Sequence, residues 1–541
     1  MLDRTDSWEE EPDLEEALSL LAAAISEGRI TDREQLQREK IRVLRGLPLS
    51  RVPGNGLILD YIDKTRPDLI EQALPLLRRK PGRTLSGVAV VAAMTSPHEC
   101  PHGRCVFCPG GADCEVPTPQ SYTGREPAAM RGAQNDFDPY LQVKNRLDQL
   151  RYIGHDVDKV DLILMGGTVT ARTHGYQERF VKGCLDAMNG APSGDIEEAQ
   201  SLNEKAPVRC IGITFETRPD RCGEEEIELM LRLGGTRVEL GVQSTFDAPL
   251  IVSGRGHDVR SSVDATRRLK DSGMKVSYHL MPGMPGSNLE MDLESARRVF
   301  EDPMFRPDKI KIYPTLVLKG TELYDCWKRG EYEPLATEEA AELVARIKEM
   351  TPPWVRISRV QRDIPSPLVD AGVKKSNLRQ LAGDIMLKQG KKCRCIRCRE
   401  VGHRSLDIGS IPQNEIEPVK REYEASGGVE VFLSYEHPDT DTLIGYLRLR
   451  KPSKEASGIV SEGTALVREV KVFGEMVPIG EGPGENWQHR GLGTGLMEKA
   501  EEHAKEKWGS HTMLVNSGIG VREYYRGMGY ERCGPYMGKH L

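Results

Sequence analysis

The chain has 541 residues, of which 38% are hydrophobic and 29% charged, and its formal net charge is −7. A soluble globular protein of about two to four domains is expected. The net negative charge argues against a protein whose whole surface binds polyanions, so basic patches must be judged one by one. No apolar run approaches the ~20 residues of a membrane helix and the acidic start lacks a signal-peptide core, so we expect a cytoplasmic protein with no membrane contact.

The first 85 residues are expected to form a separate helical segment. Arginine and lysine recur from 33 to 45, and a second basic group lies at 78–83. Such side chains can neutralise RNA phosphates, which would make 1–85 a nucleic-acid-binding segment. The alternative is a solvated helix face, because glutamates are interleaved with the basic residues.

Residues 86–385 alternate between strand-like and helix-like runs, which predicts parallel β/α units. The expected strands are 87–94, 160–165, 208–215, 237–243, 275–280 and 309–313. Six units predict an α/β fold with an incomplete (β/α)6 barrel rather than a closed barrel of eight. In such folds the active site lies at the carboxyl ends of the strands.

The loop after the first expected strand carries three cysteines, Cys100, Cys105 and Cys108. Three thiolates can hold three irons of a [4Fe–4S] cluster and leave the fourth iron open, as binding and cleavage of S-adenosylmethionine require. Phe107, between the last two cysteines, favours a cluster over zinc. If Cys114 were a fourth ligand, the site would instead be closed and structural.

The other strand ends also carry candidate ligand-binding residues. Gly166 and Gly167 follow the second strand and would let the backbone approach a ligand, although a lone Gly-Gly pair is usually a turn. Lys311 lies at the end of the sixth strand. These residues are expected to lie at the barrel mouth.

A second cysteine group, Cys393, Cys395 and Cys398, lies in a basic stretch that we assign to a linker, 386–410. Three cysteines at this spacing predict a structural zinc site. The fourth ligand is left open between His403, the nearest candidate, and Cys326. The alternative is three unliganded thiols.

Residues 411–541 differ in character and form the last expected domain. Strands are predicted at 429–435, 443–449 and 465–473, followed by a helix at 496–507. A Q-x-x-G-x-G pattern precedes this helix, and its free backbone N–H groups would suit a pyrophosphate. The residues of this pattern are Gln488, Gly491, Gly493, Thr494 and Gly495.

This last segment resembles the Gcn5-related acetyltransferases. The resemblance implies that the domain binds acetyl-CoA along the backbone of Val470, Lys471, Val472 and Phe473 and at the glycine pattern, with Tyr525 and Arg526 on the far side. A tyrosine of this family protonates the leaving thiolate, and Tyr524 and Tyr525 are the candidates here. The alternative is that one tyrosine packs in the core and the other is exposed.

Together, the two halves resemble the catalytic subunit of the Elongator tRNA-modifying system, a radical SAM barrel followed by an acetyltransferase domain. The resemblance extends from about residue 33 to the C-terminus and indicates a single-polypeptide archaeal or bacterial form that does not require the other Elongator subunits. The matching motifs are CPH at 100–102, CVFCPGG at 105–111, QSYTG at 120–124, MGGT at 165–168, TFETRPD at 214–220, ELGVQS at 239–244, KIYPT at 311–315 and GPYM at 534–537.

The resemblance implies a tRNA carboxymethyluridine synthase that acts on the anticodon loop and takes electrons from a donor. A radical derived from S-adenosylmethionine would abstract hydrogen from the acetyl methyl of acetyl-CoA. The carbon radical would add to C5 of the wobble uridine, and thioester hydrolysis would release the carboxymethyl product and CoA. The resemblance assigns Gly166 and Gly167 to the methionine moiety, Lys159 to acetyl-CoA, and Lys311 to a substrate phosphate or carbonyl.

Two other functions stay open. The C-terminal domain could acetylate protein lysines while the cluster is only structural, with Glu469 deprotonating the substrate ammonium. The chain could also be a tRNA-binding scaffold with inactive sites, although its motifs are intact.

Overall fold

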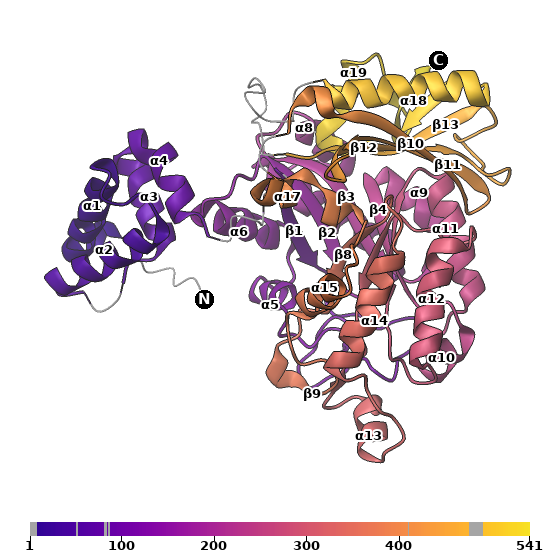
Figure 1. The fold of residues 1–541 in the computed structure, drawn as a ribbon, viewed down its shortest axis with the longest axis horizontal. Helices are drawn as coiled ribbons and strands as arrows, with labels where there is room; N and C mark the ends of the chain where they lie inside the picture. Colours follow the sequence, from indigo (N-terminus) through magenta and orange to yellow (C-terminus); the bar gives the residue numbers. More distant parts are fainter. Residues whose placement is uncertain (1–7, 50–51, 80–83, 85–86, 409–410, 475–490) are drawn as a thin grey trace. The chain divides into compact units, whose positions relative to one another are not determined.

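The structure is a computed structural model that describes residues 8–49, 52–79, 84, 87–408, 411–474 and 491–541. These residues group into two compact units, one of residues 1–89 with 144–158 and one of residues 90–143 with 159–541 (Figure 1). The expected domain boundaries at 85, 385 and 410 stay predictions, because the larger unit contains both the barrel and the C-terminal sheet.

The smaller unit confirms the expected helical N-terminal segment. Its helices are α1 (Pro12–Ser26), α2 (Arg33–Gly46), α3 (Asn55–Thr65) and α4 (Ile70–Leu77). One apolar cluster, which includes Leu18, Leu21 and Ile62, fills the space between them. Each helix presents an apolar stripe at helical spacing, and burial of these stripes stabilises the unit.

The barrel sheet of the larger unit has seven strands in the order β1-β2-β3-β4-β5-β6-β8, and the pairs from β2 to β8 are parallel. The strands are β1 (Ala89–Met94), β2 (Lys159–Met165), β3 (Arg209–Thr217), β4 (Gly235–Gln243), β5 (Lys275–Leu280), β6 (Lys309–Ile312) and β8 (Arg356–Val360). The six expected strands are confirmed. The seventh, β8, was not expected, because two arginines and a serine among its five residues leave no apolar run of the kind typical of a buried parallel strand.

Helices connect these strands. They are α5 (Pro127–Gln134), α6 (Pro139–Tyr152), α7 (His174–Asn189), α8 (Ile196–Asn203), α9 (Glu224–Arg232), α10 (Asp247–Val252), α11 (Val259–Asp271), α12 (Leu289–Glu301), α13 (Glu322–Lys328), α14 (Thr337–Met350) and α15 (Leu378–Lys388). A two-stranded sheet, β7 (Val317–Leu318) with β9 (Val369–Ala371), lies beyond β6. The open, parallel arrangement agrees with the expected incomplete barrel.

The C-terminal sheet also has seven strands, in the order β10-β11-β12-β13-β14-β16-β15. They are β10 (Glu417–Ala425), β11 (Gly428–His437), β12 (Thr442–Lys451), β13 (Thr464–Val472), β14 (Thr512–Val515), β15 (Glu531–Cys533) and β16 (Tyr536–His540). Helix α18 (Leu492–Trp508) packs on this sheet, and α19 (Arg522–Arg526) precedes β15. The three expected strands and the helix are confirmed.

The strands β13 and β14 separate part-way along their length. They pair in parallel only from Thr464 with Thr512 to Val467 with Val515. Beyond Val467, β13 continues to Val472 with β12 as its pairing partner. We call residues 468–472 the open edge of β13, because their other side has no ladder with β14.

The linker contacts both halves of the larger unit. Helix α16 (Ile396–Arg399) begins where the Ile396 amide donates to the Val355 carbonyl at 3.0 Å. Glu400 forms a β-bridge with Leu443 of β12, and α17 (Val401–Ile408) follows. No helix among the described residues is both long and apolar enough to span a bilayer.

Candidate active site

A cavity of about 160 Å³ lies at the carboxyl ends of the barrel strands. It is lined by Cys100, Cys105 and Cys108 together with Gly167 and Lys311, which are sequence-predicted residues from three separate motifs. The fold therefore brings the cysteine loop, the end of β2 and the end of β6 to one place. We call this space the cysteine cavity.

The two glycines after β2 are required by close backbone contacts. Gly166 has φ of 146°, and a Cβ there would lie 1.8 Å from Oγ1 of Thr95. Gly167 has φ of 85°, and a Cβ there would lie 2.9 Å from the carbonyl of Gln120. A side chain at Gly166 would displace Thr95, and one at Gly167 would displace Gln120, which lines the cavity. These contacts are a structural reason for the two glycines.

The thiol of Cys105 lies next to the side chains of a histidine and an arginine. Its Sγ is 3.2 Å from Nε2 of His102 and 3.5 Å from Nη1 of Arg255. A hydrogen bond from Cys108, together with His102 and Arg255, holds the pKa of Cys105 well below its usual range although burial opposes the shift. Metals and clusters bind the thiolate form, so this environment fits an iron ligand.

Cys114 does not belong to this group. Arg104 donates to its Sγ at 2.9 Å, and Cys114 is not among the residues that line the cysteine cavity. Three thiols lining one cavity fit a cluster with an open iron better than a closed four-thiolate site.

Arg255 is a site residue that the sequence patterns did not reveal. It lies in the loop after α10, where Gly254 and Gly256 have φ of 64° and 65°. The Val106 amide donates to the Ser253 carbonyl at 3.2 Å, so this loop docks directly on the cysteine loop. The only signal in the sequence is an arginine between two glycines.

The floor of the cavity is an ionic cluster. Lys311 pairs with Glu239, and its Nζ lies 3.9 Å from Oε1 of Glu216. Nε2 of His279 lies 3.0 Å from Glu239, and the Tyr122 hydroxyl donates to Glu216 at 2.7 Å. Burial alone would raise the pKa of Glu239, but Lys311 and His279 hold it well below its usual range. Lys311 is thus an ion-paired wall residue.

Several buried polar atoms of this cavity have no hydrogen-bond partner among the described residues. They include Nε of Arg255, Oε1 of Gln243 and Nδ1 of His102, and all three side chains line the cavity. Such orphaned atoms are costly unless a ligand satisfies them. A guanidinium donor and an amide acceptor are complementary to the carboxylate and ammonium of an α-amino acid.

The glycine pattern of the C-terminal sheet forms the start of α18. Gly491 precedes the helix with φ of 78°, and a Cβ on Gly493 would lie 2.6 Å from the Tyr524 hydroxyl. Thr494 and Gly495 lie in the first turn, where backbone N–H groups are available to an anion. Gln488 lies outside the described residues.

The two candidate tyrosines have different surroundings. Tyr524 is 43% exposed and hydrogen-bonds with Thr494 at the start of α18. Tyr525 is 6% exposed and packs in the core of the C-terminal domain, where burial raises its pKa. Only Tyr524 therefore presents its hydroxyl to the glycine turn, whereas Tyr525 matches the packing alternative.

The remaining predicted cofactor contacts come from β13 and the residue after it, from β2 and from α19. Val470, Lys471 and Val472 pair with β12, and the Phe473 amide donates to the Ile444 carbonyl at 2.8 Å. Lys159 is the first residue of β2, at the opposite end of that strand from Gly166. Nη1 of Arg526 is held by Glu204 at 2.7 Å. The open edge and Lys159 thus lie on the amino-end side of the barrel strands, away from the cysteines.

The three linker thiols come together. The Sγ atoms of Cys393, Cys395 and Cys398 all lie within 4.8 Å of one another. His403 is not part of this group, because its Nε2 lies 2.9 Å from Glu400. Cys326 is also absent from the group, and Arg329 donates to its Sγ at 3.4 Å. The donor set fits a zinc ion with three thiolate ligands.

Comparison with known proteins agrees with this division. Residues 95–299 match the Radical SAM superfamily, residues 307–387 the Radical_SAM C-terminal domain, and residues 484–540 the Acetyltransferase (GNAT) domain. The chain is 52% identical to a tRNA uridine(34) acetyltransferase of Methanocaldococcus jannaschii, over 95% of this chain and 96% of that protein.

This chain belongs to the Elongator catalytic subunit family. It is 44% identical to human Elongator complex protein 3, over 97% of this chain and 96% of that protein. A solved structure of Methanocaldococcus infernus Elp3 with an N-terminal deletion matches with a TM-score of 0.75 and 50% identity, covering 84% of this chain and all of the other. The expected radical SAM and acetyltransferase folds are confirmed.

Proposed function

We propose that this Elongator-family protein is a tRNA carboxymethyluridine synthase that modifies the wobble uridine. The observation that carries the proposal is one compact unit that holds both a three-cysteine cavity and an acetyltransferase sheet with an open β13 edge. A relative that is 52% identical is named tRNA uridine(34) acetyltransferase, which supports the anticodon uridine as the substrate. An external electron donor is required, and the basic residues at 33–45 and 78–83 of the helical segment are proposed to contact tRNA.

In this proposal the cysteine cavity is the radical site. Cys100, Cys105 and Cys108 would hold a [4Fe–4S] cluster, which supplies reductive cleavage of S-adenosylmethionine when both are bound. Arg255 and Gln243 would hold the carboxylate and ammonium of the methionine moiety, because each side chain lines the cavity and has a polar atom without a hydrogen-bond partner. Enclosure by the protein would keep water from a reactive carbon radical.

The open edge of β13 and the start of α18 would hold acetyl-CoA. Backbone N–H groups of the first turn would bind the pyrophosphate, and Tyr524 would donate its proton to the leaving thiolate. Lys311 would polarise a carbonyl of the substrate from the cavity floor, with Glu239 keeping its ammonium in place. The linker thiols would hold a structural zinc.

The rival lysine acetyltransferase activity is disfavoured by the position of Glu469. Its side chain is 9% exposed, and it accepts from Lys309 at 3.2 Å and from Arg448 at 3.1 Å. Lys309, Lys275 and Arg448 hold its pKa well below the usual range although burial alone would raise it. A fully paired carboxylate with such a low pKa is a poor base for a substrate ammonium.

The test uses anaerobically reconstituted protein with tRNA, S-adenosylmethionine, acetyl-CoA and a reductant. Mass spectrometry of the digested nucleosides should show carboxymethyluridine with the wild type and none with Cys105→Ala, because the substitution removes one cluster ligand. Cys533→Ala removes an exposed thiol from the other domain and should retain product. Acetylated protein lysines without modified uridine would contradict the proposal.

A further inference from the structure

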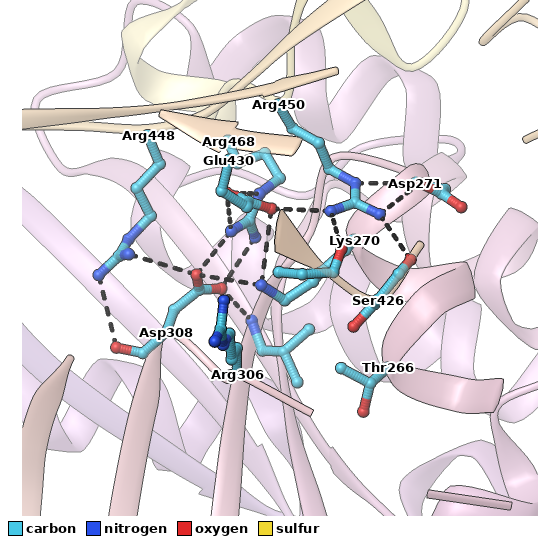
Figure 2. Close-up of polar contacts among 12 residues, drawn as sticks. Thr266, Lys270, Asp271, Arg306, Asp308, Ser426, Glu430, Arg448, Arg450 and Arg468 are labelled. Carbon is cyan, nitrogen blue, oxygen red and sulfur yellow. Dashed lines mark hydrogen bonds and ion pairs between the residues drawn. The ribbon is translucent and has the colours of Figure 1, made fainter. Parts of the chain in front are cut away.

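The two halves of the larger unit meet through a buried ionic network that the proposed function leaves unused (Figure 2). It contains side chains of both charges, and six of the nine are at most 1% exposed. The barrel contributes Lys270, Asp271, Asp308 and Lys309, and the acetyltransferase sheet contributes Glu430, Arg448, Arg450, Arg468 and Glu469.

Asp308 is the centre of this network (Figure 2). Arg468 donates to its two carboxylate oxygens at 2.6 and 2.8 Å, and the Val276 amide donates at 2.8 Å. Nη1 of Arg448 lies 3.4 Å away. The Asp308 and Arg468 side chains have no exposed surface. A buried bidentate pair of this kind holds its partners in one geometry, because separating them would leave an uncompensated charge.

The network contacts β13 at the point where β13 leaves β14. Pairing between these strands ends at Val467, and Arg468 and Glu469 are the next two residues. Glu469 accepts from Lys309 of β6 at 3.2 Å. The barrel therefore contacts the first residues of the open edge, directly before the backbone of Val470, where acetyl-CoA is proposed to bind.

The same short strand also reaches the cysteine cavity. Lys309 and Lys311 lie two residues apart on β6 and so project on one face, about 7 Å apart along the strand. Lys309 pairs with the acetyltransferase sheet, whereas Lys311 lines the cavity and pairs with Glu239. The wall between the open edge of β13 and the radical site is thus only a few residues thick.

We infer that Asp308 and Lys309 of the barrel are positioning residues for acetyl-CoA, because they hold the open edge of β13 against the amino-end side of the barrel. They act through Arg468 and Glu469, and do not touch the ligand themselves. The inference rests on the proposed function, since it needs acetyl-CoA to bind along the open edge. Buried ion pairs often add little net stability, so stability alone is a weak explanation for this network. A role in positioning the open edge of β13 explains it better.

The test compares Lys309→Met with Lys309→Arg and with Asp271→Asn. Lys309→Met removes one of the two ion-pair partners of Glu469, and Arg448 still pairs with that carboxylate, so we expect the fold to be kept. Lys309→Arg keeps the charge. Asp271→Asn is the matched control, because Asp271 pairs with Arg450 and Ser453 at the far end of the network. Asp308→Asn would face three cations at once and is too drastic for the first test.

Binding of desulfo-coenzyme A is measured by calorimetry, beside S-adenosylmethionine binding to the reconstituted protein and the thermal midpoint. Lys309→Met should raise the Kd of desulfo-coenzyme A about tenfold or more, leave the Kd of S-adenosylmethionine within about twofold, and be rescued by Lys309→Arg. Asp271→Asn should lower the midpoint and leave both Kd values unchanged. An unchanged Kd in Lys309→Met, or equal losses in Lys309→Met and Asp271→Asn, would overturn the inference. A wild type that does not bind desulfo-coenzyme A would refute the proposed function itself.

Discussion

Gly256 lies where the loop after α10 contacts the cysteine loop. A Cβ there would lie 2.6 Å from Cβ of His102, whose ring contacts Cys105. Gly254, two residues earlier, has nearly the same positive φ, but the nearest atom to its added Cβ is 3.8 Å away. Alanine at Gly254 would therefore add backbone strain alone, whereas alanine at Gly256 would add the same strain and a steric overlap with His102.

Gly256→Ala should lower the iron and sulfide content per chain after anaerobic reconstitution by about half or more, because the overlap pushes His102 and Arg255 away from Cys105. Gly254→Ala adds only left-handed strain of about 1–2 kcal/mol and should reconstitute like the wild type after correction for its lower thermal midpoint. Equal iron content in the two variants would show that the close contact does not shape the cluster site.

The sequence predicts site residues well where they lie together in a short motif. It does not predict interaction partners that come from strands far apart in the chain. The cysteines and Gly167 were found from local spacing, and all of them line the cavity. The sequence does not reveal Glu239 as the partner of Lys311, because Glu239 of β4 and Lys311 of β6 come together only after the sheet has formed. The difference between Tyr524 and Tyr525 likewise depends on packing around α18, which spacing alone does not reveal.

At the scale of elements, strands with a long apolar run are predicted from the sequence, whereas strands of mostly polar sequence are not. The six barrel strands were expected, whereas β8 and β10 were not, because each has a polar residue at almost every second position. Such strands are recognised only once a neighbouring strand pairs with them. The linker is a similar case, since α16 is very short and its position depends on contacts with β8 and β12.

The linker thiols give a prediction about this element. Cys395→Ser should reduce bound zinc from about one ion per chain to well below half, because only three thiols converge there and a hydroxyl is a weaker ligand. Cys326→Ser is the matched control and should keep zinc, since that thiol lies outside the group. Elemental analysis of purified protein measures both, and zinc loss in the control variant would place Cys326 in the site.

At the scale of the whole molecule, the larger unit has its two proposed sites at opposite ends of the barrel strands. The cysteines lie at the carboxyl ends of the strands, and the acetyltransferase sheet is attached near the amino ends through Asp308, Lys309 and their partners. An ordinary barrel interior is filled by aliphatic side chains. Here the strands also carry ion pairs, such as Arg237 of β4 with Asp161 of β2 at 2.9 Å.

The measurement that tests the central claim most directly follows deuterium from acetyl-CoA labelled on the acetyl methyl. With tRNA, S-adenosylmethionine and a reductant present, the account predicts deuterium in the 5′-deoxyadenosine product and the remaining label in the carboxymethyl group of the uridine. Both products should disappear in Cys105→Ala. Unlabelled 5′-deoxyadenosine formed alongside modified uridine would show that the radical does not act on the acetyl group and would contradict the coupling of the two sites.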